Sequence, residues 1–186
     1  MSDDHSDPLN ERVTASERVY LGRIMSVRVD TVELADGRIA VREVVEHAPV
    51  VAIVPVDADG NVILVRQYRL PAEDVLLEIP AGGVDPGESV EGAAQRELRE
   101  ETGCRAGTLD DIGGFYVSPG YVTEFIHLFL ARDLTEDGLE GDADEQIEVV
   151  RMPLAEAVRL IDMGEINDGK TILGLLLTAR QRGLGG

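Results

Sequence analysis

The chain has 186 residues, of which 44% are hydrophobic and 28% are charged. This length and balance indicate an ordinary globular chain with one main domain and a sizeable core. The formal net charge of −19 argues against nucleic acid and anionic membranes as partners, because such a surface repels them.

Three further features bear on location. The longest apolar run, residues 48–56, has the length of a strand and not of a membrane span. The acidic, polar start of the chain lacks the features of a signal or transit peptide. A single cysteine, Cys104, excludes an internal disulfide. We therefore expect a cytoplasmic protein that does not bind membranes.

The first part of the chain predicts a loose segment followed by a small sheet. Residues 1–16 are polar and acidic, so we expect a flexible N-terminus. Runs rich in β-branched residues predict strands over residues 19–24, 25–34 and 39–47. Asp36-Gly37 is typical of a hairpin turn between two of them. We predict that residues 17–47 form an N-terminal antiparallel β subdomain.

Residues 48–186 predict the main domain, in which strands and helices interleave. Expected strands cover residues 49–56, 61–69, 76–80, 111–117, 123–130 and 146–152. Expected helices follow Ser89 as far as Thr102 and cover residues 153–163 and 169–182. Such interleaving predicts an α/β (α+β) sandwich with a mixed sheet between helices.

The most informative stretch is residues 82–104, GGVDPGESVEGAAQRELREETGC. Its first part predicts a tight loop, because these residues disfavour helices and central strands: Gly82, Gly83, Pro86 and Gly87. Ser89 suits the N-cap of a helix made of strong helix formers. Gly103 is well placed as its C-cap. The stretch therefore predicts a loop that leads into a short helix.

Three carboxylates share one side of this predicted helix. Glu97, Glu100 and Glu101 fall within an arc of about 100° on a helical projection. Such charges repel one another unless a cation lies among them, and hard oxygen ligands suit Mg²⁺ or Mn²⁺. The alternative is a solvated acidic face, since charge runs are usually surface features.

The spacing of this stretch resembles the Nudix box, G-x5-E-x7-R-E-U-x-E-E-x-G-U, where U is a bulky apolar residue. The matching positions are Gly82, Glu88, Arg96, Glu97, Leu98, Glu100, Glu101 and Gly103. The final position departs slightly, because it is Cys104. The resemblance implies a Nudix-type α/β/α sandwich with a mixed sheet. It also implies metal-dependent hydrolysis of a nucleoside diphosphate that is linked to another group.

The same resemblance implies roles for the residues of the box. Glu97 and Glu101 would be the main metal ligands, Glu100 a further one, and the backbone carbonyl of Ala81 would complete the metal site. The metal would be Mg²⁺, with Mn²⁺ as an alternative.

Other box residues would shape the site. Arg96 would orient the glutamates, and Glu88 would brace the loop against the helix. Gly82 and Gly103 complete the structural positions of the box.

A second motif narrows the substrate. Pro119, in Ser118-Pro119-Gly120, follows Gly103 by sixteen residues. It resembles the proline that marks ADP-ribose pyrophosphatases within the Nudix group, although a plain turn is the alternative. Four further stretches match the same subfamily: residues 42–47, 66–69, 78–82 and 166–171. The resemblance covers roughly residues 18–180.

Three side chains are candidates for substrate contact. Arg69 is planar and always charged, so it suits a phosphate or stacks on adenine, and Arg42 is a similar candidate. In relatives the equivalent arginine of the N-terminal sheet reaches the partner's site, which implies a homodimer. Glu78 would bind a ribose hydroxyl or structure the loop. Surface ion pairing is the alternative for both arginines.

An acidic segment, residues 140–147, is the candidate source of a general base. Many family members carry a catalytic glutamate in this loop, and Glu145 matches best. Glu140, Asp142 and Asp144 are further candidates, and a solvated acidic loop is the alternative. A box glutamate such as Glu100 can also serve as the base through a water.

Together these features predict Mg²⁺-dependent hydrolysis of ADP-ribose, or of another ADP-sugar, to AMP and ribose 5-phosphate. One alternative is a Nudix hydrolase of another small molecule, such as a GDP-sugar, NADH or a diadenosine polyphosphate. The other is a Nudix domain that senses ADP-ribose or NAD without hydrolysis. The domains expected are a flexible segment 1–16, a dimerising subdomain 17–47 and a Nudix hydrolase domain 48–186.

Overall fold

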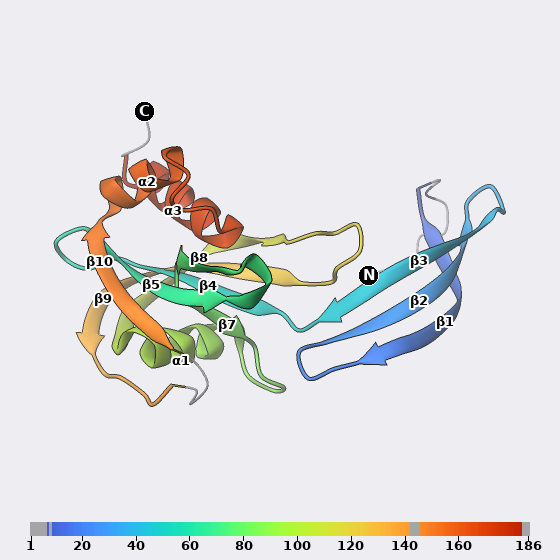
Figure 1. Cartoon of the computed structure of the whole chain (residues 1–186), viewed down its shortest axis with the longest axis horizontal. Coiled ribbons are helices and arrows are strands. Elements are labelled where there is room, and N and C mark those ends of the chain that lie inside the picture. The colour runs from blue at the N-terminus through green and yellow to red at the C-terminus, as the bar shows by residue number, and fades with distance from the viewer. Residues whose placement is uncertain (1–6, 8, 142–145, 184–186) are drawn as a thin grey trace. The chain divides into compact units, whose positions relative to one another are not determined.

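The structure is a computed structural model that describes residues 7, 9–141 and 146–183. Contacts divide the chain into two units (Figure 1). The first comprises Met1–Ala48 with Tyr116–Phe125, and the second comprises Pro49–Phe115 with Ile126–Gly186. None of the described helices has the length and apolar character that crossing a membrane requires.

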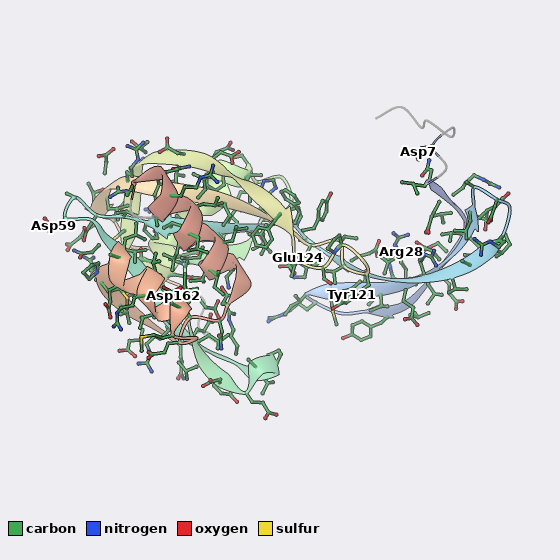
Figure 2. All side chains as sticks on the ribbon, turned by 90° about the horizontal axis from the view of Figure 1, so that it is seen from above. Asp7, Arg28, Asp59, Tyr121, Glu124 and Asp162 are labelled. Carbon is green, nitrogen blue, oxygen red and sulfur yellow. The ribbon has the colours of Figure 1, made fainter. Side chains whose placement is uncertain are left out.

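The first unit is built on a three-stranded antiparallel sheet. Its strands are β1 (Glu11–Leu21), β2 (Met25–Leu34) and β3 (Ile39–His47), in the order β1-β2-β3. The segment around Tyr121 joins β3, because the Val45 amide donates to the Tyr121 carbonyl at 2.7 Å and the Thr123 amide to the Val45 carbonyl at 2.9 Å. Figure 2 shows the side chains of this unit, with Arg28 and Tyr121 labelled.

The start of β1 corrects the sequence prediction. Residues 11–16 were expected to belong to a flexible segment, but the strand begins at Glu11 and pairs with β2 as far as Leu34. The expected strand over residues 19–24 also ends early, at Leu21. Composition misled here because every residue of β1 is exposed, so the strand has no buried alternation to mark it.

The second unit contains two sheets and three helices. The strands are β4 (Val50–Pro55), β5 (Asn61–Arg69), β6 (Asp74–Glu78), β7 (Ala81–Gly83), β8 (Cys104–Tyr116), β9 (Phe125–Glu136) and β10 (Ile147–Pro153). One sheet has the order β7-β4-β9-β8 and the other β10-β5-β6. The first is mixed, since β4 runs parallel to β9 and antiparallel to β7. The helices are α1 (Val90–Thr102), α2 (Leu154–Asp162) and α3 (Gly169–Gln181), and Leu70–Ala72 forms a short 3₁₀ turn.

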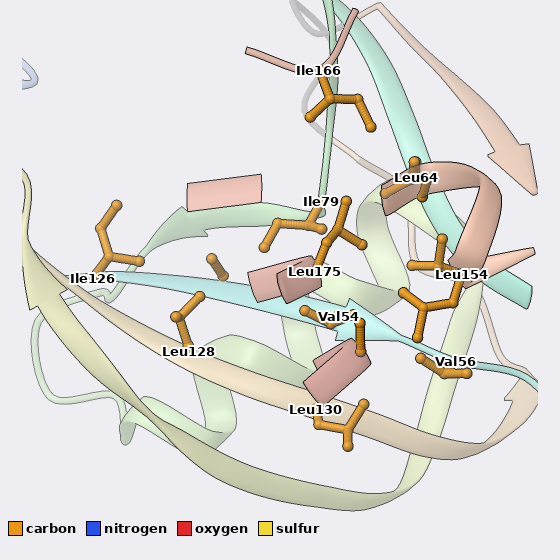
Figure 3. Close-up of a cluster of buried hydrophobic side chains, with 14 of the residues drawn as sticks. Val54, Val56, Leu64, Ile79, Ile126, Leu128, Leu130, Leu154, Ile166 and Leu175 are labelled. Carbon is orange, nitrogen blue, oxygen red and sulfur yellow. The ribbon is translucent and has the colours of Figure 1, made fainter. Parts of the chain in front are cut away.

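Strand β4 shows how the core is divided. All six of its residues are buried, and the first five alternate between two clusters. Val50, Ala52 and Val54 belong to a cluster with residues of α2 and α3 (Figure 3). Val51 and Ile53 belong to a second cluster with residues of α1. Because the sheet is covered on both faces, the unit is the α/β/α sandwich with a mixed sheet that the sequence predicted.

Strand β8 also begins earlier than predicted, at Cys104 and not near residue 111. Its first part, residues 104–110, contains few of the bulky apolar residues that mark a strand. Pairing with β9 stabilises this part of the strand, and that long-range contact is not visible in a local pattern.

Close packing of α3 on the sheet gives a testable expectation at Gly174. A Cβ at this position would lie 2.9 Å from Val54 Cγ2 and 3.0 Å from Ile79 Cδ1. Gly174→Ala should therefore lower the free energy of unfolding by about 1–3 kcal/mol, although alanine favours helices. Urea unfolding measures the change. Gly169→Ala, at the start of the same helix, is the control, because a Cβ added there would meet no atom within 4 Å. Equal stability of the two variants would contradict the packing argument.

Candidate active site

The loop and helix of the glycine- and glutamate-rich stretch have the predicted local structure. The Gly92 amide donates to the Ser89 hydroxyl at 3.0 Å, which caps α1, and Gly103 closes the helix in the left-handed region with φ 72°. Ala93, Ala94 and Leu98 pack into the second core cluster. This packing fixes the helix on the sheet and leaves another side of it for the glutamates.

A cavity of about 720 Å³ lies at this side of α1. It is lined by Ala81, Gly82, Gly83, Asp85, Arg96, Glu97, Glu100, Glu101, Gly141 and Ile147. The structure thus brings together the box carboxylates, Arg96 and the backbone of β7. Of the three glutamates, Glu101 has the smallest exposed fraction, with 9% of its surface accessible.

Gly82 allows the β7 backbone to approach the carboxylate of Glu97. β7 is held by pairing with β4, in which Gly82 lies opposite Val51. A Cβ at Gly82 would overlap the Glu97 carboxylate, so only glycine fits while Glu97 keeps its position. Ala81, the residue before Gly82, lines the same cavity as Glu97.

Arg96 connects the loop to two of the glutamates. Its Nε and Nη2 donate to both oxygens of Glu88 at 3.1 and 3.0 Å, and Nη2 also donates to the Gly83 carbonyl at 2.9 Å. Its Nη1 donates to Glu97 at 2.6 Å and to Glu100 at 3.1 Å. The hydrogen bond with Glu88, followed by those with Glu97 and Glu100, raises the pKa of Arg96. Arg96 is therefore a permanent cation that orients three carboxylates.

We expect Glu88→Gln to lower the free energy of unfolding at neutral pH. We also expect the stability of this variant to fall less than that of the wild type as the pH is lowered. The hydrogen bond from Arg96 holds the pKa of Glu88 below its ordinary value of 4.5. The pair therefore stabilises the folded chain above that pH, and the effect is lost as the pH falls through the lowered pKa. Because solvent screens this partly exposed pair, the difference at neutral pH is about 0.5–1 kcal/mol.

Urea unfolding of the wild type and of Glu88→Gln over a pH series from neutrality into acid measures this difference. The two stability curves should converge in acid. Curves that stay parallel throughout would contradict the contribution of the Glu88–Arg96 pair.

The donor set of the cavity fits a hard divalent cation. Carboxylate and carbonyl oxygens are the ligands that Mg²⁺ and Mn²⁺ prefer. Among the described residues, no group of three or more His, Cys, Asp or Glu is arranged to hold an ion as it stands. Arg96 holds Glu97 and Glu100 through one carboxylate oxygen each.

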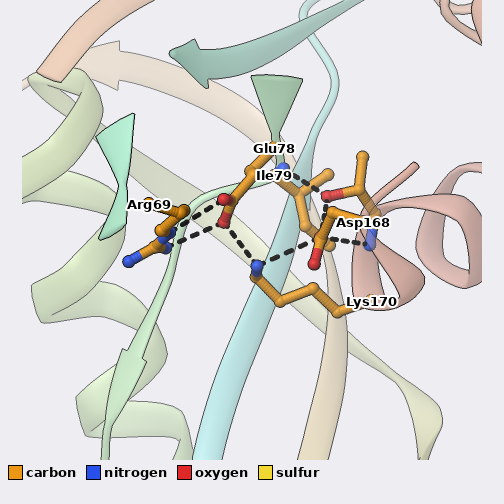
Figure 4. Close-up of polar contacts among 6 residues, drawn as sticks. Arg69, Glu78, Ile79, Asp168 and Lys170 are labelled. Atoms are coloured by element: carbon orange, nitrogen blue, oxygen red, sulfur yellow. Dashed lines mark hydrogen bonds and ion pairs between the residues drawn. The ribbon is translucent and has the colours of Figure 1, made fainter. Parts of the chain in front are cut away.

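Glu78 and Arg69 form a pair outside the cavity lining (Figure 4). Glu78 is 1% exposed, and its two oxygens accept from Arg69 Nε and Nη2 at 2.8 Å each. Burial raises the pKa of Glu78, but hydrogen bonds from Arg69 and the charge of Lys170 outweigh it, so the pKa lies below its ordinary value. The sequence left Glu78 open between ribose contact and loop structure; in the structure its buried carboxylate is bound by Arg69 and Lys170.

Sequence reasoning gave no separate role to Asp168 and Lys170, which complete this cluster. Lys170 Nζ donates to Glu78 at 2.5 Å and to Asp168 at 3.0 Å. The available signal was that the one lysine of the chain follows an aspartate at a predicted helix start. The contact between Lys170 and Glu78 spans 92 positions, which no local pattern indicates.

Arg42 and Pro119 belong to the first unit. Arg42, on β3, donates from Nε and Nη2 to Glu11 of β1 at 2.9 and 2.5 Å, and the hydrogen bond with Glu11 raises its pKa. This is the surface ion pairing that the sequence left as an alternative. Pro119 lies in the connection between β8 and β9, before the segment that joins β3.

The predicted general base, Glu145, lies outside the described residues, as do Asp142 and Asp144. On either side of them, Gly141 and Ile147 line the cavity. Glu140 is described and exposed, and it is not among the cavity residues.

Comparison with known proteins identifies both units. A model of the NUDIX domain matches residues 46–174, and a model of the nucleoside diphosphate sugar hydrolase N-terminal domain matches residues 11–45. The chain is 41% identical over 165 residues to the ADP-ribose pyrophosphatase of Bacillus subtilis (strain 168), which covers 88% of this chain and 89% of that protein. It is 39% identical over 165 residues to the ADP-ribose pyrophosphatase of Mycobacterium tuberculosis (strain ATCC 25618 / H37Rv), with 87% and 80% covered.

A solved structure agrees with these matches. The crystal structure of an ADP compounds hydrolase superposes with a TM-score of 0.85 and 32% sequence identity, and covers 97% of this chain and 99% of that one. The resemblance seen in the box is therefore confirmed over most of the chain, and the fold has a close counterpart. The chain belongs to the Nudix hydrolase family.

Proposed function

We propose that this chain hydrolyses the diphosphate of ADP-ribose to AMP and ribose 5-phosphate, with Mg²⁺ as cofactor. The observation that carries the proposal is the cavity in which Glu97, Glu100 and Glu101 face the backbone of β7. Its volume of about 720 Å³ lies within the range of small-molecule sites. The choice of ADP-ribose is supported by relatives that are ADP-ribose pyrophosphatases and match nearly the whole chain.

In this proposal Glu97, Glu100, Glu101 and the Ala81 carbonyl hold Mg²⁺, and Mn²⁺ is able to replace it. The ion supplies positive charge that offsets the negative charge developing on the phosphoryl oxygens. The overall charge of −19 would otherwise repel an anionic substrate. The cofactor and nearby arginines therefore have to provide the local attraction.

Side chains of the protein orient the glutamates and the substrate. Arg96 donates to Glu97 and Glu100 and so holds both glutamates beside the loop at the cavity. Arg69 binds a phosphate or stacks on the adenine, and Arg42 does so from the N-terminal sheet of a partner subunit. We assign Pro119 and Glu78 to substrate binding as well, with Glu78 acting through Arg69.

Removal of a proton from the attacking water is assigned to Glu145. Support comes from the chain on either side, since Gly141 and Ile147 both line the cavity. Glu100, which lines the cavity itself, is the alternative base through a water.

We further propose a cytoplasmic homodimer, with the N-terminal sheet of β1 to β3 as the dimerising subdomain ahead of the catalytic domain 48–186. One face of the N-terminal sheet carries an apolar hollow of about 420 Å³, lined in part by Val19, Val41 and Tyr121. Each of these side chains belongs to a residue that is more than half exposed, which is costly for an isolated unit and suits burial against a second copy. Light scattering that gives twice the chain mass is the expected result, and a monomer would reject the dimer.

A product assay tests the activity. Purified protein with Mg²⁺ is given ADP-ribose, GDP-mannose, NADH, a diadenosine polyphosphate or a nucleoside triphosphate, with EDTA as the control. Fast release of AMP from ADP-ribose that EDTA abolishes is the expected result. Faster cleavage of another compound would keep the mechanism and reject the substrate. Binding of ADP-ribose without any cleavage would favour a sensing domain instead.

A further inference from the structure

The guanidinium of Arg69 is fixed along one edge only. Nε and Nη2 are both bound by Glu78, whereas none of the described residues accepts a hydrogen bond from Nη1. The Arg69 side chain is 37% exposed, so a ligand can reach it. The hydrogen bond to Glu78 raises the pKa of Arg69 most, and the charge of Glu101, a cavity residue, adds to this. Arg69 therefore lies within electrostatic reach of the cavity and has a donor to offer.

The carboxylate that fixes Arg69 is itself held by α3. Lys170 Nζ donates to Glu78 Oε2 at 2.5 Å, the same oxygen that accepts from Arg69 Nη2. Lys170 also donates to Asp168 Oδ2 at 3.0 Å, and Asp168 caps α3 by accepting from the Thr171 amide at 3.0 Å. The charges thus form a chain from the first turn of α3 to Arg69 (Figure 4).

The backbone beside Glu78 is tied to the same turn. Thr171 Oγ1 accepts from the Ile79 amide at 2.9 Å and donates to Asp168 Oδ2 at 2.6 Å. Thr171 and Ile79 are both buried, at 0% and 1% exposed. The side chain of Glu78 and the peptide that follows it are therefore both hydrogen-bonded to the first turn of α3. These two contacts leave Glu78 little freedom to move.

We propose that Lys170 and Asp168 are positioning residues for substrate. Through Glu78 they hold the guanidinium of Arg69 so that its Nη1 edge meets a phosphate or the adenine of the bound nucleotide. This proposal rests on the proposed function, because it names how that site orients its substrate.

The choice of lysine at this position supports the proposal. Sixteen of the seventeen basic residues of the chain are arginine, and the one lysine is Lys170. Its side chain is only 12% exposed and lies between two carboxylates. A compact ammonium with three donors can reach both carboxylates from this nearly buried position. Without Lys170, the carboxylate of Glu78 would lose its own contact with α3, and only the backbone beside it would stay tied to that helix.

The test is Lys170→Met in the full chain, which removes the charge and keeps most of the volume. We expect the KM for ADP-ribose to rise about tenfold while kcat changes less than about threefold, since a charged hydrogen bond is lost from the orientation of a binding residue. Calorimetric titration with Mn²⁺ should give an unchanged affinity. In ¹⁵N NMR, the Nε–H signal of Arg69, assigned by its loss in Arg69→Lys, should exchange with water at least about fivefold faster.

Two further variants make the test decisive. Glu78→Gln with Lys170→Met serves if the single variant fails to fold. It removes one charge of each sign, so the net charge of the cluster is kept and the fully buried side chain at position 78 is neutral. The same rise in KM is expected. Arg159→Met is the matched control, because Arg159 is an exposed cation of α2 that pairs with Glu156, outside the cavity and the Arg69 cluster. It should leave the KM and the Arg69 signal unchanged.

An unchanged KM and an unchanged Arg69 signal in the folded single or double variant would overturn the proposal. Equal losses of kcat and of Mn²⁺ affinity would also overturn it, because Lys170 would then support the metal loop and not Arg69. If the wild type does not hydrolyse ADP-ribose, the proposed function fails, and the exchange of the Arg69 Nε–H still decides whether Lys170 positions that side chain.

Discussion

Glu101→Gln should lower kcat for ADP-ribose by at least about 10³-fold, which is the largest effect that we expect from a single substitution. Glu101 lies in the last turn of α1, lines the cavity and is 9% exposed. Glutamine has the same shape but no charge, so the cavity loses an anionic oxygen while the packing of α1 is kept. Steady-state kinetics with Mg²⁺, a Mn²⁺ titration by calorimetry and the thermal midpoint measure the three consequences.

The matched control is Glu91→Gln on the same helix. Glu91 lies in the first turn of α1 and is exposed, so its substitution changes the global charge equally. It should cost a few tenths of a kcal/mol of stability, about the value of an acidic residue at a helix start, and leave kcat unchanged. Near-normal kcat in Glu101→Gln would reject the assignment of Glu101 as a metal ligand.

Gly82→Ala is expected to have the second largest effect, a fall in kcat of at least about 10²-fold with a loss of about 1–3 kcal/mol of stability. The added methyl group would overlap the carboxylate of Glu97, so either Glu97 or β7 has to move. Because β7 pairs with the fully buried strand β4, the side chain of Glu97 should move first. Kinetics and urea unfolding on the same preparation measure both losses.

Gly83→Ala serves as the control for that variant. It is the next residue of β7, where successive side chains point to opposite faces. A Cβ at Gly83 would meet no atom within 4 Å. This variant should keep wild-type kcat and stability to within about 0.5 kcal/mol. If both glycine variants behaved alike, the close approach of β7 to Glu97 would not be the cause.

The local signals in the sequence predicted the loop and helix of the box well. The cap at Ser89, the closing Gly103 and the side of the helix that carries the glutamates all depend on residues within one short stretch. These features were predictable because short-range geometry determines them.

Features that depend on distant pairing were not predictable in the same way. β1 has no buried residue, and only its pairing with β2 makes it a strand. Arg69 and Glu78 could be recognised as functional candidates, but their coupling to Lys170 depends on where the chain returns 92 positions later. The pairing of Arg42 with Glu11 also crosses the middle strand of the N-terminal sheet, β2. Contacts between distant parts of the chain determine each of these features, and they cannot be predicted from the local sequence.

The two-sided burial of β4 has a consequence for how this family member can change over time. Val51 and Ile53 support the helix that carries the glutamates, while Val54 touches the helix whose first turn holds Lys170. A single strand thus sets the separation of two functional layers. A larger side chain on either face would displace a layer, so drift in substrate preference is expected to accumulate in loops and surface positions and to leave this strand nearly invariant.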